Sequence, residues 1–141
     1  MKYVLDASVA VKWTLPESDS AKALALLDDI NAGLIDAVAP NTFPVEVAHA
    51  LTKAERRGVI PLGEAMLGLA EVMSFAIAMH ESLQLLMRAV ELASEKRIGV
   101  YDCLYVALAE EQDCELITAD ARLFKVFQES SRIVLLSDLY L

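Results

Sequence analysis

Short apolar runs that stop close to an aspartate constrain the fold of this chain more than any other sequence feature. The first run, Lys2–Leu5, is β-branched and aromatic and ends at Asp6. The second run, Glu115–Thr118, is followed by Ala119 and Asp120. Each has the length and composition of a short strand, and a segment with helical spacing follows each one. This alternation predicts an α/β fold, with a parallel sheet that carries helices on both faces.

The same patterns, read along the chain, predict a single domain over residues 1–141, a length typical of one domain. Residues 62–96 are expected to be mostly helical, with 75–79 either a short strand or a connector. The remaining expected strands are 2–5, 35–39, 115–118 and 133–136, and the remaining expected helices are 7–15, 18–31, 43–57, 101–112 and 122–128.

Charge and composition exclude several classes of protein. The chain has 12 Lys and Arg against 21 Asp and Glu, a net charge of -9, which argues against sequence-blind binding of nucleic acid through a basic surface. No uncharged apolar stretch has the length of a membrane span, and the first residues lack a signal-peptide pattern. Cys103 and Cys114 are too few for a disulfide framework. We therefore expect a cytoplasmic protein that does not enter a membrane.

Asp6 and Asp120 are expected at the carboxyl edge of the sheet, because each follows a predicted strand and precedes a predicted helix. In open α/β sheets, ligands bind at this edge. Each residue also has a simpler explanation, since Asp is a favoured N-cap residue and suits the positive end of a helix. The pattern around either residue alone leaves capping and ligand binding open.

Glu46 lies on a helix face that otherwise suits the core. Helical spacing places it on one stripe with Phe43, Val47 and Ala50. A buried ionised carboxylate without a counter-charge is costly, so we expect Glu46 to be protonated, paired with a Lys or Arg, or bound to a cation.

Asp102 also faces apolar positions one turn ahead along its predicted helix. It is equally explained as an acidic residue in the first turn of a helix, where the helix dipole favours a negative charge.

Together the four carboxylates favour a metal site. They meet if the strands before Asp6 and Asp120 are neighbours and the helices of Glu46 and Asp102 flank them. Carboxylates this close raise one another's pKa unless divalent cations neutralise them. Hard oxygen ligands favour Mg²⁺ or Mn²⁺, and no His or Cys residues have zinc-site spacing.

Another function that starts from an Asp at a strand end is that of a phosphatase of the haloacid dehalogenase type. Such an enzyme requires a second Asp two residues after the first. This chain has Ser8 at that position, which argues against a phosphatase.

Four segments of the chain match a known family in their order: VLDASVAVKW with Asp6, FPVEVAHALTKAERRG with Glu46, VYDCLYVALAE with Asp102, and LITADARLF with Asp120. Through them the chain resembles the PIN-domain family, and specifically the VapC-type toxins of bacterial and archaeal toxin–antitoxin pairs. The segments together span nearly the whole chain. One departure is His49, where the family often has Asn, and we interpret this position as one that modulates the site.

The resemblance implies a three-layer α/β/α PIN-like domain and an endoribonuclease that depends on Mg²⁺ or Mn²⁺, the toxin of a type II toxin–antitoxin system. It implies that Asp6 and Asp102 are direct metal ligands, and that Glu46 and Asp120 complete the cluster directly or through water. Metal-activated water would then hydrolyse an RNA phosphodiester bond and leave a 5′-phosphate and a 3′-hydroxyl.

Other residues near these acids have candidate supporting roles. Ser8 and Thr118, each two residues from an acid, either hydrogen-bond the carboxylates or a metal-bound water, or only make local turn bonds. Basic side chains that are candidates for RNA phosphate contacts are Lys12, Lys53, Arg56 and Arg57. Arg56 and Arg57 are also explained as charges at a helix C-terminus.

The resemblance also implies partners, namely an RNA substrate, a cognate VapB-type antitoxin and a second copy in a homodimer. In the family, an antitoxin segment crosses the acidic site and can offer it a basic side chain. Apolar residues make up 56% of the chain, enough for some to form such interfaces while most fill the core. The candidate interface residues include Met66, Leu67, Leu69, Met73, Leu85, Leu86 and Met87. The alternative function is a non-catalytic PIN-like module that acts through protein partners.

Overall fold

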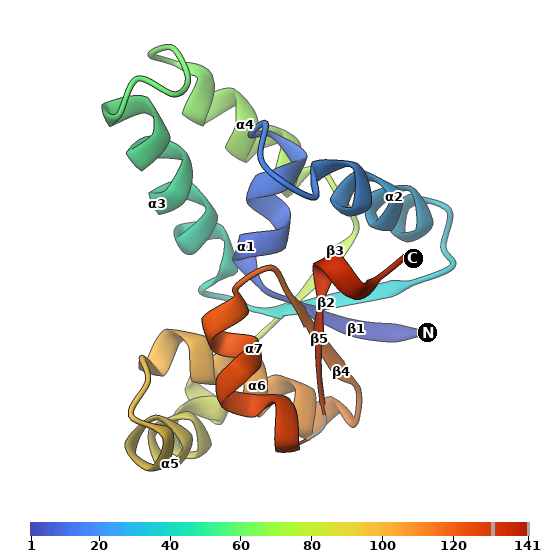
Figure 1. Cartoon of the computed structure of the whole chain (residues 1–141), viewed down its shortest axis with the longest axis vertical. Coiled ribbons are helices and arrows are strands. Elements are labelled where there is room, and N and C mark those ends of the chain that lie inside the picture. Colours follow the sequence, from blue (N-terminus) through green and yellow to red (C-terminus); the bar gives the residue numbers. More distant parts are fainter. Residues whose placement is uncertain (131, 141) are drawn as a thin grey trace.

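The computed structural model describes residues 1–130 and 132–140, which form one five-stranded sheet. The strand order is β3-β2-β1-β4-β5, and every neighbouring pair is parallel (Figure 1). The strands are β1 (Lys2–Leu5), β2 (Asp36–Pro40), β3 (Ile77–His80), β4 (Glu115–Thr118) and β5 (Ile133–Leu135). The parallel sheet expected from the sequence is confirmed.

Helices cover both faces of the sheet, with α1 to α4 on one side and α5 to α7 on the other (Figure 1). On the second side α6 packs on β1, β2 and β4, and α5 packs on α6. The α-helices are α1 (Ala7–Ala10), α2 (Ser20–Asn31), α3 (Phe43–Arg56), α4 (Glu64–Met73), α5 (Leu86–Lys96), α6 (Val100–Gln112) and α7 (Ala121–Phe127). The three-layer α/β/α architecture is therefore confirmed. In the described part of the chain, no helix has both the length and the apolar character needed to cross a membrane.

The connections between strands change their direction across the sheet at the boundary between β1 and β4. Connections from β1 to β2 and from β2 to β3 move toward one edge of the sheet, whereas the connection from β4 to β5 moves toward the other. Right-handed crossovers place the helices of these two sets on opposite faces. Ligands of open α/β sheets bind in the crevice outside the carboxyl ends of the strands at such a reversal. Asp6 and Asp120, which follow β1 and β4, both lie there.

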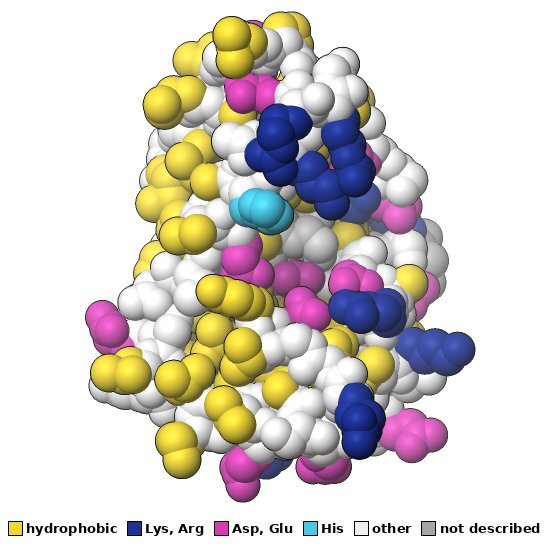
Figure 2. Space-filling model, turned by 90° about the vertical axis from the view of Figure 1, so that its left-hand side faces the viewer, with side chains coloured by type: hydrophobic (Ala, Val, Ile, Leu, Met, Phe, Trp, Pro, Cys, Tyr) yellow, Lys and Arg dark blue, Asp and Glu magenta, His cyan; other side chains and the backbone are white. Residues whose placement is uncertain are grey.

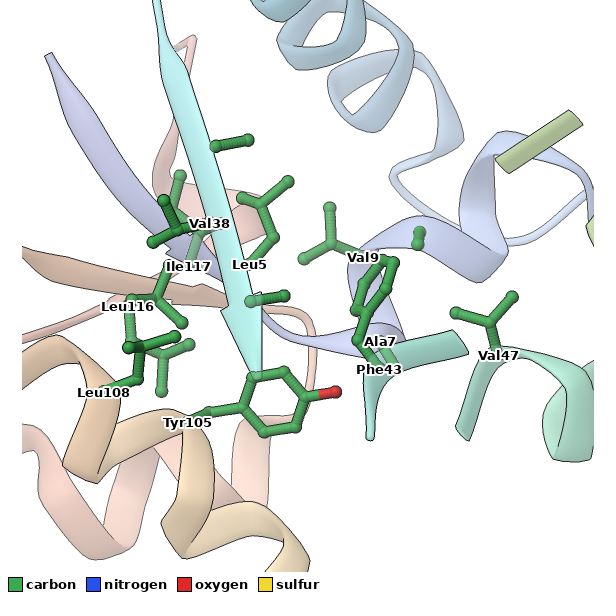
Figure 3. Close-up of a cluster of buried hydrophobic side chains, with 14 of the residues drawn as sticks. Leu5, Ala7, Val9, Val38, Phe43, Val47, Tyr105, Leu108, Leu116 and Ile117 are labelled. Carbon is green, nitrogen blue, oxygen red and sulfur yellow. The ribbon is translucent and has the colours of Figure 1, made fainter. Parts of the chain in front are cut away.

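The two central strands are buried because helices cover them from both sides. Val4 and Leu5 of β1, and Leu116 and Ile117 of β4, are at most 1% exposed. Strands in such a sheet need continuous apolar residues rather than alternation, and each fully buried side chain contributes about 1.5 to 3 kcal/mol. In Figure 3, Tyr105 extends from α6 beneath this cluster, and its hydroxyl points toward α1 and α3.

The segment 62–96 contains a strand, which was one of the two alternatives expected for residues 75–79, the other being a connector. β3 pairs with β2 inside this segment and separates α4 from α5. Its side chains are half-buried or exposed because β3 is an edge strand. An edge strand lacks the continuous apolar run that marks a central strand, which explains why the sequence pattern left this point open.

The first two helices differ from their expected bounds. The α-helix that starts at Ala7 ends after one turn and continues as the 3₁₀ helix Val11–Trp13. There the indole of Trp13 donates a hydrogen bond to the carbonyl of Ala23 at 2.8 Å, which ties this turn to α2. α2 itself begins at Ser20 rather than residue 18, because Asp19 has a positive φ of 62°.

Most apolar residues fill the core, as expected, but most of the candidate interface residues do not. Leu85 is buried and Leu69 is half-buried against the core. The others are exposed, and they are Met66, Leu67, Met73, Leu86 and Met87. They lie on α4 and at the start of α5, which are the outer helices of the two faces and have no further layer above them.

Candidate functional site

The site is built around the ends of the two central strands. Leu5 and Ile117 are partners in the β1–β4 register, and the amide of Asp6 continues the ladder by donating to the carbonyl of Ile117 at 3.1 Å. Asp6 and Thr118 are therefore neighbours across the two strands. Both side chains are buried, and they are the two buried polar residues in the described part of the chain.

Two hydroxyl groups hold the Asp6 carboxylate. Ser8 and Thr118 each donate to Asp6 Oδ2 at 2.7 Å. Each hydroxyl has only one proton, so both protons are committed to Asp6. As acceptors, the same oxygens receive the backbone N–H groups of Ala119 and Asp120, each at 3.0 Å. The sequence left two roles open for Ser8 and Thr118, a bond to a carboxylate or a local turn bond. Both roles are present, because each hydroxyl bonds the Asp6 carboxylate and also accepts a backbone N–H of the turn after β4.

Burial raises the pKa of Asp6, and repulsion from Asp120 raises it further, while the bonds from Ser8 and Thr118 lower it. Asp6 occupies the N-cap position of α1, as the capping explanation expects, but its side chain makes no capping hydrogen bond there. For Asp120 the capping explanation is confirmed. Its Oδ1 accepts from the amides of Arg122 and Leu123 at 2.9 and 3.2 Å. Capping does not remove Asp120 from the site, because only one carboxylate oxygen is used for the cap.

Replacing Thr118 by Val should lower the free energy of unfolding by about 1 to 3 kcal/mol. The substitution keeps the shape of a fully buried side chain but leaves Asp6 Oδ2 and the Asp120 amide each without one partner. Urea denaturation measures the change. Thr118→Ser, which keeps the hydroxyl, should cost less. Thr52→Val is the matched control, because the exposed Thr52 hydroxyl bonds only to backbone carbonyls of its own helix. Equal stability of Thr118→Val and Thr52→Val would contradict this account of Asp6.

Glu46 lies in the first turn of α3 and faces the site from the side of the α1–α4 layer. Its Oε2 accepts hydrogen bonds from the hydroxyls of Thr42 at 3.0 Å and Tyr105 at 2.9 Å. Burial raises the pKa of Glu46 to about 7, against the lowering effect of these two bonds, and repulsion from Asp6 and Asp102 adds to the rise. Glu46 has no Lys or Arg partner among the described residues, so the ion-pair alternative is wrong.

Asp102 lies in the first turn of α6 and faces the site from the opposite layer. Burial raises the pKa of Asp102 to about 6, and repulsion from Asp6 and Asp120 contributes, while Arg122 lowers it. Arg122 lies 3.6 Å from Asp102 Oδ2, but its own side chain is 72% exposed. A water-exposed ion pair of this length is weak, so Arg122 offsets only part of the negative charge.

The four carboxylates line a single pocket of about 580 Å³. Asp6 and Asp120 come from the strand ends, Glu46 from α3 and Asp102 from α6, as the hypothesis of convergence requires. In Figure 2, acidic side chains gather in the central hollow of the molecule, with a histidine and Lys and Arg side chains above and further basic side chains below. His49 is exposed and lines the same pocket one turn after Glu46.

The carboxylates are turned toward protein donors in this arrangement. Glu46 is held by two hydroxyls, Asp120 by the start of α7, and Asp102 is drawn to Arg122. Over residues 1–130 and 132–140, no group of three or more His, Cys, Asp or Glu side chains stands ready to hold a metal ion. The donors are nevertheless all carboxylate oxygens, the type that Mg²⁺ and Mn²⁺ prefer, and three of them have raised pKa values. Coordination would require side-chain rotation within the pocket.

Comparison with known proteins identifies the family. A family model described as the PIN domain matches residues 3–128 of the chain. The chain belongs to the PIN-domain family. Among curated relatives of this PIN domain, Ribonuclease VapC3 of Pyrobaculum aerophilum is 35% identical over 130 residues, covering 90% of this chain and 95% of that protein. Ribonuclease VapC9 of Mycobacterium tuberculosis is 31% identical over 108 residues, covering 74% of this chain and 84% of that protein.

Solved structures share the fold of this PIN domain at lower identity. PAE2754 from Pyrobaculum aerophilum superposes with a TM-score of 0.69 at 21% identity, covering 99% of this chain and 95% of that one. VapBC2 from Rickettsia felis, bound to a DNA fragment from its promoter, has a TM-score of 0.64 at 17% identity over 96% and 97% of the two chains. VapC20 of Mycobacterium tuberculosis, described as a Sarcin-Ricin loop cleaving toxin, has a TM-score of 0.65 at 15% identity over 87% and 93%.

Three residues of the PIN-domain site were not predicted from the sequence. Tyr105 is fully buried and looked like an ordinary core residue, yet its hydroxyl bonds Glu46. A tyrosine in place of phenylalanine at a core position is the signal that was available, since a buried hydroxyl needs a partner. Thr42 precedes α3 and bonds Glu46 one turn later. Arg122 in α7 reaches Asp102 in α6, and no local pattern predicts such a contact.

Proposed function

We propose that this PIN domain is a VapC-type endoribonuclease, the toxin of a type II toxin–antitoxin system, and that it uses Mg²⁺ or Mn²⁺. One observation carries the proposal. Four carboxylates from distant parts of the sequence line one pocket at the switch point of the sheet, and three of them have pKa values raised mainly by burial. Carboxylates that are buried together without a counter-charge destabilise the fold, and such groups are typical of functional sites. The names of the curated relatives agree with the proposal.

In the proposed site, Asp6 and Asp102 hold the cation, and Glu46 and Asp120 complete the set directly or through water. The donor set fits, because hard divalent cations take carboxylate oxygens. A divalent cation bound there would lower the pKa of a water molecule and neutralise charge that develops on the phosphoryl group. It would also reverse the local negative field, so that a chain with a net charge of -9 can accept a polyanion at this point.

The residues around the carboxylates position them. Thr118 at the end of β4 and Ser8 in α1 both hold Asp6 Oδ2. Tyr105 and Thr42 both hold Glu46 Oε2. We further propose that Arg122, which is exposed and bonded only loosely to Asp102, can leave that carboxylate and contact a phosphate of the substrate.

Basic residues along α3 extend the site. Lys53, Arg56 and Arg57 follow Glu46 and His49 at helical spacing, are exposed, and make no ion pair with any residue that the structure describes. They lie at the C-terminal end of α3, where the helix dipole favours positive charge. Stabilising the helix end and contacting RNA phosphates are compatible roles for these residues. We propose that they contact RNA phosphates outside the pocket. Lys12 does not fit this role, because it is largely covered and pairs with Glu17.

Incubation of the purified protein with total RNA tests the proposal. We expect new RNA ends in Mg²⁺ or Mn²⁺, each with a 5′-phosphate and a 3′-hydroxyl, and no cleavage in EDTA. Ligation-based end mapping identifies the positions. Cleavage that survives EDTA, or that produces 2′,3′-cyclic ends, would overturn the proposed chemistry.

We propose two partner surfaces for the exposed apolar residues. A groove of about 320 Å³ between α3 and α4, lined by Leu62, Met66 and Leu69 among others, suits an amphipathic segment of a VapB-type antitoxin. Met87 and Val90 on the outer face of α5 are 81% and 47% exposed and would pack against a second copy in a homodimer.

Charge substitutions separate the two surfaces. Met66→Glu should weaken antitoxin binding at least about tenfold in calorimetry, since a charge would be buried in the groove. Met87→Glu should instead reduce self-association in sedimentation velocity. Leu34→Glu, at an exposed apolar residue outside both surfaces, should change neither. Unchanged antitoxin affinity in Met66→Glu would remove the groove from the proposal, and a monomeric wild-type chain would remove the homodimer.

A further inference from the structure

A second hollow adjoins the carboxylate pocket, and Tyr101 separates the two. This hollow has a volume of about 440 Å³, and Tyr101 is the one residue that lines both spaces. Tyr101 directly precedes Asp102 at the start of α6. The residue is 60% exposed, and its hydroxyl has no protein partner in the described part of the chain. An exposed aromatic ring next to an acidic pocket needs an explanation, because neither packing nor hydrogen bonding accounts for it.

The second hollow is lined by both apolar and polar residues, and the polar ones are here called its polar wall. Its apolar lining comes from Leu83, Leu86 and Leu104, together with the Tyr101 ring. Its polar lining comes from the loops after β2 and β3, and consists of Asn41, Thr42, Glu81 and Ser82. A flat ring that has apolar faces and presents donors and acceptors at its edge matches such a mixed lining. An apolar peptide side chain would leave the polar wall without partners, which is unfavourable.

Hydrogen-bonding capacity remains free at the polar wall. The Asn41 carbonyl oxygen accepts from the amide of Ser82 at 3.3 Å and from the Ser82 hydroxyl, whereas the Asn41 amide nitrogen has no partner among the described residues. Glu81 is exposed and forms no ion pair there. The wall therefore offers one donor group and one acceptor-only carboxylate, a combination that suits the hydrogen-bonding edge of a nucleobase.

We propose that this hollow, here called the base hollow, receives an unstacked base of the RNA next to the phosphate at the carboxylate pocket, with Tyr101 stacking on that base. The proposal rests on the proposed ribonuclease function and names a recognition site within it. Proteins that recognise RNA sequence do so mainly on splayed-out bases that stack on aromatic side chains. The acceptor-only Glu81 requires a donor on the base, either an exocyclic amino group or a ring N–H, and the Asn41 amide bonds an acceptor beside that donor.

Steady-state cleavage of a short single-stranded RNA with a mapped cut position tests this proposal. Tyr101→Ala should raise KM about 5- to 100-fold with little change in kcat, the range expected for loss of one stacked base. Tyr101→Phe should keep most of the activity, because stacking needs the ring and not the hydroxyl. Tyr140→Ala is the matched control, since Tyr140 is also exposed but lines neither space, and it should leave KM unchanged. An unchanged KM in Tyr101→Ala would overturn the proposal.

Abasic substitution in the RNA identifies the base. For the wild-type enzyme, removing one particular base beside the cut should raise KM about as much as Tyr101→Ala does. The Tyr101→Ala enzyme should lose little more on that abasic RNA, because both changes remove the same contact. Fully additive losses at every flanking position would overturn the stacking contact. Glu81→Gln, which replaces an acceptor-only group by one that also donates, should change the base preference at that position, and an unchanged preference would remove Glu81 from the recognition.

Failure of the base hollow and failure of the proposed function have different signatures. If the wild-type protein cuts no RNA, the ribonuclease function fails, and fluorescence anisotropy with the same labelled RNA in Ca²⁺ then decides the base hollow. Weaker RNA binding by Tyr101→Ala than by wild type supports it, and equal binding overturns it. If Tyr101→Ala instead weakens only antitoxin binding, the occupant is a peptide and the proposal is wrong.

Discussion

Asp6→Asn and Asp102→Asn should each lower metal-dependent RNA cleavage more than roughly 100-fold. Even residues that only support a metal ligand typically contribute 10- to 100-fold, so loss of a direct ligand should exceed that range. Asn preserves the shape of the side chain and removes its charge and its second acceptor oxygen. Asp6 is nearly fully buried, so its retained shape matters for the fold as well as for the site. Single-turnover cleavage of a defined RNA measures the effect.

The controls separate a lost site from a lost fold. Both variants should unfold at or above the wild-type temperature in EDTA, because each removes a carboxylate that burial and neighbouring acids disfavour. Asp28→Asn removes the same charge from an exposed position on α2 and should cleave RNA like wild type. Full activity of Asp6→Asn or Asp102→Asn, after contaminating nuclease has been excluded, would reject the assignment of the site.

In EDTA, the free energy of unfolding should fall as the pH rises from about 4 to 8. The folded protein has raised pKa values for Asp6, for Asp102 (to about 6) and for Glu46 (to about 7), so it binds more protons than the unfolded chain in this range. A raised carboxyl pKa stabilises the fold below the ordinary pKa, and that stability is lost as the pH passes through the folded value. Thermal unfolding at pH 5 and pH 8 measures the change.

Divalent cations should reverse this loss at pH 8 and have little effect at pH 5, where protons compete for the carboxylates. At 100 times its dissociation constant, a bound ion stabilises the folded state by about 2.7 kcal/mol. Asp102→Asn should flatten the pH dependence and reduce the response to Mn²⁺, whereas Asp28→Asn should do neither. Absence of any saturable Mn²⁺ binding in calorimetry at pH 8 would favour the non-catalytic binding module.

The strands and the acids that follow them could be predicted from sequence, because they depend on local chemistry. Val4, Leu5, Leu116 and Ile117 form continuous apolar runs, as strands covered on both faces require. The predictions failed or stayed open where burial was partial. β3 is an edge strand with a weak pattern. For Met66 and Met87 the sequence left a choice between the core and an interface, and both residues face outward.

The sequence by itself determined the alternation of strands and helices, the family resemblance, and the identity of the four carboxylates, because these follow from spacing and residue type along the chain. Only the tertiary structure decided what surrounds each carboxylate. It separated Asp120, whose side chain caps a helix, from Asp6, whose side chain does not, and it brought Tyr105 to Glu46. The contacts of Tyr105 with Glu46 and of Thr118 with Asp6 join residues 59 and 112 positions apart, and strand order and helix packing, not local sequence, bring such residues together.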